Sequence, residues 1–246
     1  MKTANSLLKD NSERAKSLIL VLWLFVGLFF IGLLFSFNEL SILYQLQTNN
    51  EVADSRLNFS DISLVIVGAF QLLFHIATIV VFLNWFRRAY ANLYRLRIPI
   101  ESNDSMAVWS FFIPIYNLFK PYQIMKEIWE KTQQAVKKID VSFLFNKNSY
   151  LIGLWWFLFI ISGVVDRVAF KMALKQETVN QLIEGTKISI ISDVISIINA
   201  IVLIYLVKNI SQFESVLFEK TKLIPVENIP SEKTPEKKKV KFRGEE

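Results

Sequence analysis

The main pattern along the chain is four nearly uncharged apolar runs separated by polar stretches. The runs cover residues 18–37, 62–86, 151–170 and 188–207. A helix of ~20 residues crosses the ~30 Å hydrocarbon core of a bilayer, and a backbone in hydrocarbon must satisfy its hydrogen bonds within its own helix. The sequence therefore predicts an all-α protein, an integral membrane four-helix bundle built from two in-out-in hairpins.

The first run has a competing interpretation as a cleaved signal peptide. The apolar part of a signal peptide is ~7–15 residues long and is followed by small residues at the cleavage site. This run is about twenty residues long and leads into Ser36, Phe37 and Asn38. These features favour a span that is retained.

The polar stretch between the second and third runs, residues 99–149, is too regularly patterned for a linker. Residues 107–119 are apolar but too short to span and contain Pro114, which predicts an interfacial or re-entrant segment. From Pro121 to residue 138, apolar residues recur at helical spacing between charged ones. They predict an amphipathic basic helix, which either lies in the inner headgroup layer or packs as a lid on the bundle.

The remaining segments complete a three-part organisation. Residues 1–17 form an N-terminal segment, residues 18–220 the membrane domain, and residues 221–246 a basic tail. The tail contains Pro230 and Pro235 and few apolar residues, so we expect it to be disordered. The second and fourth helices should continue beyond the bilayer, because neither meets a helix breaker before Pro99 or Pro225 respectively.

The distribution of positive charge predicts the orientation. The formal net charge is +6, and Lys plus Arg number four in residues 1–17, one in 38–61, ten in 87–149 and nine in 208–246. Positively charged loops stay on the cytoplasmic side during insertion. We therefore expect a multi-pass protein of the inner (plasma) membrane with both termini and the central segment in the cytoplasm. The exceptions lie beside the second outer connection: Arg167, Lys171, Lys175 and Lys187.

Composition removes most catalytic chemistry. The chain has no Cys, one His and seven Gly, which excludes thiolate chemistry and leaves little for metal ligation or phosphate-binding loops. We expect no enzyme activity, no cofactor and no metal site, and no nucleic-acid partner.

Polar side chains inside the predicted spans are the next candidates, because each ionisable one costs ~2.5–3.5 kcal/mol at the centre of a bilayer. Asp166 and Arg167 on the third span fall at a depth similar to that of Asp193 on the fourth, which predicts an Arg167–Asp193 ion pair. The alternative is that these side chains extend separately to the outer surface. Polar stripes on the second and fourth helices predict hydrogen bonds between helices. The alternative is that the single His relays protons or binds a cation. The candidates are Gln71, His75, Asp166, Arg167, Asp193 and Asn199.

Three further stretches carry a family resemblance: Trp85–Leu93, Trp109–Trp129 and Leu151–Val165. They contain Arg88, Ala89, Asn92, Leu93, Pro114, Asn117, Leu118, Pro121, Trp129, Trp155 and Trp156. With this combination the chain resembles the bacterial domain-of-unknown-function (DUF) 4328 family over roughly residues 15–220. The resemblance implies a small multi-pass membrane protein and no known activity, substrate or cofactor. Phe111 and Phe112 stand where that family often has an additional Trp. We expect Asn117 to hydrogen-bond backbone groups freed by the two neighbouring prolines.

Two functions follow from these expectations. The first is a non-catalytic membrane platform that binds lipid, including anionic lipid headgroups, or a protein partner. The alternative is a small transporter or channel that uses Gln71, His75 and Asp193. Because four spans are few for a solute pathway, the alternative calls for a homo-oligomer.

Overall fold

The computed structural model describes residues 4–174 and 177–222. Four long helices dominate it: α1 (Ser12–Gln47), α2 (Asp54–Arg95), α5 (Tyr150–Ala173) and α6 (Val179–Thr221). The shorter elements are η1 (Ala4–Leu7), α3 (Met106–Trp109), η2 (Tyr116–Leu118) and α4 (Lys120–Ile139). The described chain is all-helical, as predicted; the predicted tail falls almost entirely on residues 223–246, which lie outside the described residues.

All four long helices are apolar and long enough to cross a membrane. At ~1.5 Å per residue, the 42 residues of α2 and 43 of α6 extend about 63 Å, twice the thickness of the hydrocarbon core. The predicted continuation of both helices beyond the bilayer is therefore confirmed. The start of α6 is fixed locally by Thr178 and Gln181, whose side chains and backbone groups form a capping box.

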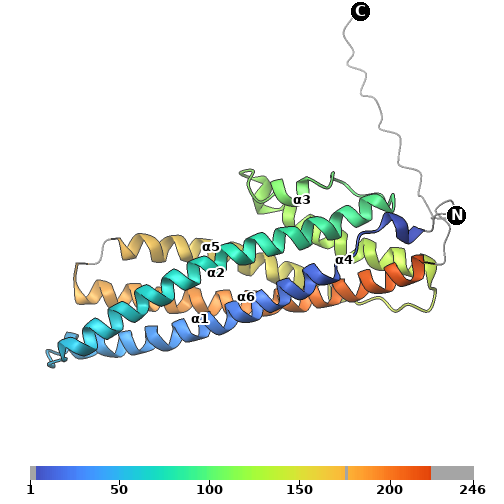
Figure 1. The fold of residues 1–246 in the computed structure, drawn as a ribbon. Coiled ribbons are helices and arrows are strands. Elements are labelled where there is room, and N and C mark those ends of the chain that lie inside the picture. Colours follow the sequence, from blue (N-terminus) through green and yellow to red (C-terminus); the bar gives the residue numbers. More distant parts are fainter. Residues whose placement is uncertain (1–3, 175–176, 223–246) are drawn as a thin grey trace, which may run out of the picture.

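The long helices form two hairpins that pack through α1 and α6 (Figure 1). α1 packs along both α2 and α6, and α6 packs along α5. Residues 48–53 join α1 to α2 at one end of the molecule, where α5 also ends and α6 begins (Figure 1); we call this the far end. The opposite end holds η1, α4 and the ends of α2 and α6; we call it the α4 end (Figure 1).

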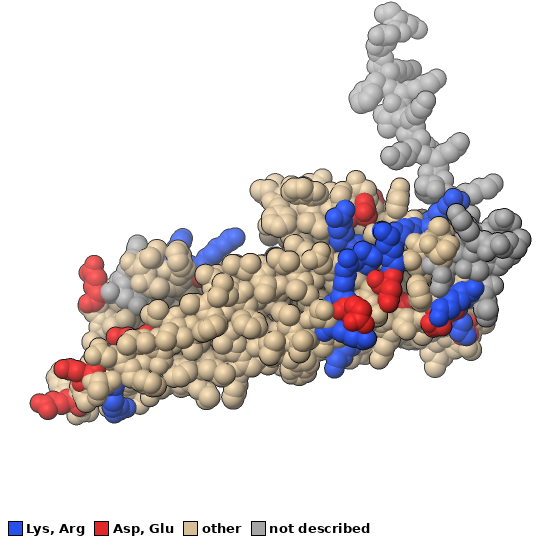
Figure 2. Space-filling view, in the orientation of Figure 1, with Lys and Arg blue, Asp and Glu red and all other residues tan. Residues whose placement is uncertain are grey.

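The surface agrees with a membrane setting. Figure 2 shows few charged side chains along the middle of the long helices and many at both ends. Large apolar residues on this middle surface are exposed, among them Val65 and Leu72 on α2 and Phe157 on α5. An apolar surface of this extent requires a bilayer around it.

α4 packs as a lid, which decides between the two predicted positions for this helix. Its apolar residues Ile124, Met125, Ile128, Trp129 and Val136 are at most 1% exposed. They contact α6 and the end of α2, so this apolar face is not available to lipid. Pro121 stands in the first turn of α4, where a missing N–H costs no helical hydrogen bond.

The segment from α3 to η2 lies beside α2 and is mostly exposed (Figure 1). It contains only two short helical turns, so it does not span a membrane, and the prediction of a non-spanning segment is confirmed. Ile115 has a φ of 70°, a conformation that β-branched residues rarely adopt, and its side chain is 71% exposed. We call the exposed apolar residues of this segment the apolar shelf: Trp109, Phe112, Ile113, Ile115, Tyr116, Leu118 and Phe119.

Candidate functional site

A polar cluster joins three helices within the membrane-spanning region. The Gln71 amide nitrogen lies 3.5 Å from an Asp193 carboxylate oxygen, which links α2 to α6. The carboxylate of Asp166 on α5 accepts hydrogen bonds from the hydroxyl groups of Ser162 and Ser192. Gln71 on α2 and Asp193 on α6, one residue of each predicted polar stripe, are thus brought together. Such interhelical bonds are worth ~0.6–2 kcal/mol each and orient the helices.

Gly32 on α1 makes room for this cluster. A Cβ atom at this position would collide with the Gln71 amide nitrogen and lie 3.3 Å from an Asp193 oxygen. A side chain at position 32 would therefore force the Gln71 amide to shift away from its contact with Asp193.

The predicted Arg167–Asp193 ion pair is wrong. No such pair occurs among the described residues: the side chain of Arg167 is exposed, and the Asp193 carboxylate is bonded by Gln71. Successive residues on a helix point about 100° apart, so the face of α5 that presents Asp166 to Ser192 turns Arg167 elsewhere. The two carboxylates are bonded by neutral donors instead.

The other two intramembrane candidates do not join the cluster through hydrogen bonds. His75 is exposed on α2, and its ring centroid lies 5.9 Å from that of Phe25 on α1. The Asn199 side-chain oxygen is buried and has no hydrogen-bond partner among the described residues. The described residues contain no group of three or more His, Cys, Asp or Glu side chains that could hold a metal ion.

The family-motif residue Asn92 holds the N-terminal segment at the α4 end. Its amide oxygen accepts a hydrogen bond from the Lys9 backbone N–H at 3.1 Å, and its amide nitrogen donates to the Lys9 carbonyl at 2.9 Å. Arg95 also donates to the Asn92 oxygen, at 3.1 Å. Asn92 thereby satisfies both backbone groups of Lys9 and fixes the path of the chain into α1.

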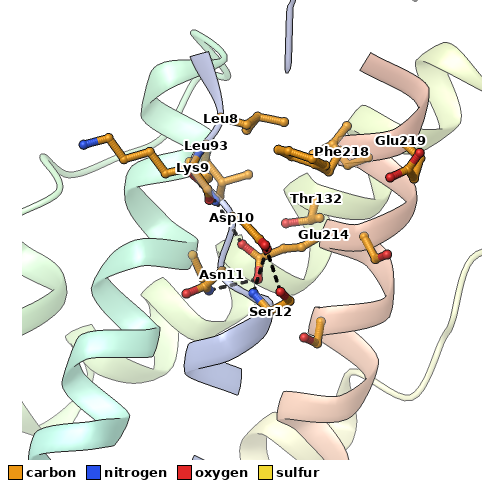
Figure 3. A pocket seen from close by; sticks show the side chains of 15 residues that line it. Leu8, Lys9, Asp10, Asn11, Ser12, Leu93, Thr132, Glu214, Phe218 and Glu219 are labelled. Carbon is orange, nitrogen blue, oxygen red and sulfur yellow. Dashed lines mark hydrogen bonds between the residues drawn. The ribbon is translucent and has the colours of Figure 1, made fainter. Parts of the chain in front are cut away.

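Glu214 on α6 accepts hydrogen bonds from two amides at the same place (Figure 3). Asn11 donates to one carboxylate oxygen at 3.0 Å and Asn92 to the other at 3.3 Å. Burial raises the pKa of Glu214 to about 7, and the two amide donors only partly oppose this effect. A cavity of about 230 Å³ adjoins the carboxyl group, with Leu8, Thr132 and Phe218 in its wall.

Four arginines lie close to one another on α1 and α2, and one of them, Arg95, donates to Asn92 of this site. We call Arg14 on α1 and Arg87, Arg88 and Arg95 on α2 the arginine cluster. Burial lowers the pKa of Arg88 below its ordinary value, and repulsion from the other three arginines lowers it further. Of these four arginines, only Arg87 has a carboxylate within 4 Å among the described residues, namely Asp104 at 4.0 Å. The cluster therefore carries positive charge with little nearby compensation.

The motif tryptophans join the central segment to the bundle. The Trp129 indole N–H donates to the Asn146 carbonyl at 3.2 Å, and the Trp156 indole N–H donates to the Leu118 carbonyl at 2.8 Å. Trp155 packs on Phe82 of α2, with ring centroids 5.9 Å apart. These contacts fix α4 and the apolar shelf against α5 and α6.

The loop between the two motif prolines differs from the expectation. The structure gives Asn117 a backbone hydrogen bond from its N–H to the Ile113 carbonyl and no side-chain hydrogen bond with another described residue. The turn after Pro114 is therefore closed by backbone groups, such as the Tyr116 N–H bonded to the Pro114 carbonyl, rather than by the Asn117 amide.

The sequence did not reveal Glu214 as the shared acceptor of Asn11 and Asn92. Asn11 and Glu214 lie 203 residues apart, and each is an ordinary polar residue near one end of a long helix. The available signal was the position of Glu214, which falls between the apolar residues Phe213 and Leu217 beyond the fourth span.

The chain has four helices that are apolar and long enough to span a membrane, with an exposed apolar surface between their charged ends. These features define a multi-pass α-helical membrane protein. The chain belongs to the family described as Domain of unknown function (DUF4328), whose model matches residues 48–212. The matched region includes Asn92 but ends just before Glu214. No curated protein and no solved structure matches the chain.

Proposed function

We propose that this protein is a non-catalytic membrane platform whose α4 end faces the cytoplasm and binds anionic phospholipid headgroups. The observation that carries the proposal is the arginine cluster, three of whose four members have no carboxylate within 4 Å among the described residues. Arginine presents a planar set of donors that matches the oxygens of a phosphate group.

The depth of the cluster supports a lipid ligand. Arg14 precedes the predicted first span by four residues, and Arg88 follows the second span by two. At ~1.5 Å per residue, both lie about 3–6 Å beyond the hydrocarbon, which is the headgroup layer. A lipid phosphate can reach both helices there without leaving the bilayer.

The apolar shelf also supports contact between the α4 end and lipid. It is continuous with the uncharged surface of the long helices and includes Trp109 and Tyr116, residue types that favour the membrane interface (Figure 2). Ile115 and Leu118 are more than half exposed. The shelf is therefore suited to insert into the leaflet next to the arginine cluster.

The cytoplasmic assignment follows from the charge distribution. The described parts of the three segments richest in Lys and Arg gather at the α4 end, and the far end carries Arg56, Arg167, Lys171 and Lys187. This asymmetry favours an α4 end that stays inside the cell during insertion.

Lipid selectivity in reconstituted bilayers tests the proposal. The association of spin-labelled phosphatidylglycerol is measured relative to phosphatidylcholine for the wild type and for Arg14→Gln and Arg88→Gln. Each substitution should reduce the preference for phosphatidylglycerol about fivefold, because a cation near an anionic lipid surface contributes ~1 kcal/mol. Arg56→Gln, which removes an exposed arginine at the far end, is the matched control and should change little. Equal losses in all three variants, or no loss in any, would reject the proposal.

A further inference from the structure

Glu214 couples the amide network of the N-terminal segment to the arginine cluster. Arg88 stands one helical turn before Asn92 on the same face of α2, and Asn92 donates to Glu214, so the guanidinium and the carboxyl group belong to the same corner of the bundle. The two groups form no ion pair within 4 Å among the described residues. The carboxyl oxygens of Glu214 are bonded by the neutral amides of Asn11 and Asn92. The charge state of Glu214 therefore changes the field at Arg88 without breaking a direct contact.

No cation among the described residues forms an ion pair with Glu214 within 4 Å. The N-terminal segment contributes Lys9 and Asp10, and Asp10 repels an ionised Glu214. Asp10 is itself held by the Ser12 backbone N–H at 2.8 Å, which lowers its pKa and keeps it ionised. The element α4 presents Thr132, which carries no charge. The other charged groups on this side are Arg88 and Arg95 on α2, Arg14 on α1 and Glu219 on α6.

We propose that Glu214 regulates the binding of anionic phospholipid by the arginine cluster. The neutral carboxyl group leaves the Arg88 guanidinium available to a lipid phosphate, and the ionised carboxylate competes with that phosphate for the same positive charge. This inference rests on the proposed function and adds proton control to it.

The geometry makes this control effective near neutral pH. Burial between α2, α6 and the N-terminal segment raises the pKa of Glu214 to about 7, so both forms are populated over the pH range of a cell. The amide donors of Asn11 and Asn92 can serve either form, because a neutral carboxyl group still accepts hydrogen bonds. The site can therefore change charge without a change of fold.

The experiment compares wild type and Glu214→Gln in bilayers at pH 5.5 and 8.5. Phosphatidylglycerol and the arginines keep their charges over this range, so a pH-dependent selectivity originates in the protein's other groups. For the wild type, the preference for spin-labelled phosphatidylglycerol over phosphatidylcholine should fall about threefold from pH 5.5 to 8.5, the size of a screened charge interaction. Glu214→Gln, which keeps the shape of the neutral group, should retain the higher preference at both pH values.

A matched control and the Arg88→Gln variant separate the outcomes. Glu219→Gln removes an exposed carboxylate on the same helix and should keep the wild-type pH response. A preference that depends on Arg88 but not on pH, or a Glu214→Gln variant that still loses affinity at pH 8.5, would overturn the regulatory inference alone. A preference that is unchanged in Arg88→Gln would overturn the proposed function itself.

Discussion

The α4 end and the membrane-spanning part of the bundle bury their apolar residues in different ways. Trp85, Phe86 and Trp129 near the α4 end are at most 1% exposed within the chain, whereas Leu72 and Leu73 in the middle of α2 are more than 60% exposed. The first group is stabilised by packing inside the protein and the second by the surrounding lipid. Stability should therefore depend strongly on side chains at the α4 end and weakly on outward-facing ones in the spans.

The sharpest contrast is between two aromatic substitutions. Trp129→Ala removes a buried indole that packs edge-to-face on Phe213 and donates to the Asn146 carbonyl, and it should lower the free energy of unfolding by about 3–5 kcal/mol. Phe157→Ala removes a ring that is 60% exposed toward lipid and should cost less than about 0.5 kcal/mol. Unfolding in mixed detergent micelles measures both. Similar losses would show that the two regions are packed alike.

The pH dependence of stability probes the α4 end alone. The folded protein raises the pKa of Glu214 from 4.5 to about 7, so between these values it holds a proton that the unfolded chain has released. The contribution of Glu214 to the free energy of unfolding is therefore complete below about pH 4.5. It falls as pH rises, by about 3 kcal/mol in total once the pH is above 7. Glu214→Gln should remove this decline and be the more stable protein at pH 8. If the free energy of unfolding changed equally between pH 5 and pH 8 in the two proteins, Glu214 would not be the group responsible.

Asn92 provides a smaller test of the same region. Asn92→Ala leaves the Lys9 backbone groups and one Glu214 oxygen without their amide partner and should cost about 2 kcal/mol. Asn84→Ala, at an exposed position two turns earlier on α2, is the matched control and should cost less than about 0.5 kcal/mol. Thermal denaturation in detergent compares them, and an equal loss would mean that Asn92 does not hold the N-terminal segment.

The smallest effect concerns the far half of the bundle. Because Asp193 is bonded to Gln71 and Arg167 is exposed, Arg167→Ala and Asp193→Ala should be additive within about 0.3–0.5 kcal/mol. A double-mutant cycle on thermal stability measures the coupling. A coupling above about 1 kcal/mol would show that Arg167 and Asp193 interact directly, contrary to the structure.

Local patterns predicted the elements well and the long-range contacts poorly. The four spans, the extensions of α2 and α6 and the amphipathic α4 follow from apolar periodicity and from the positions of proline, which act over a few residues. Depth along a helix placed Asp166 and Asp193 at a common level. It did not determine that Asp166 rather than Arg167 faces α6, because that depends on the rotation of α5 about its own axis. The bonds of Asn92 to Lys9 and Glu214 depend on where three chain segments converge, which periodicity does not report.

The sidedness of the two ends tests the central claim most directly. The chain contains no cysteine, so single substitutions Glu101→Cys at the α4 end and Asn50→Cys at the far end can each be labelled uniquely in intact bacterial cells. With a membrane-impermeant maleimide, Asn50→Cys should react from outside, and Glu101→Cys should react only after the membrane is permeabilised. Labelling of Glu101→Cys in intact cells, with Asn50→Cys protected, would contradict a cytoplasmic α4 end.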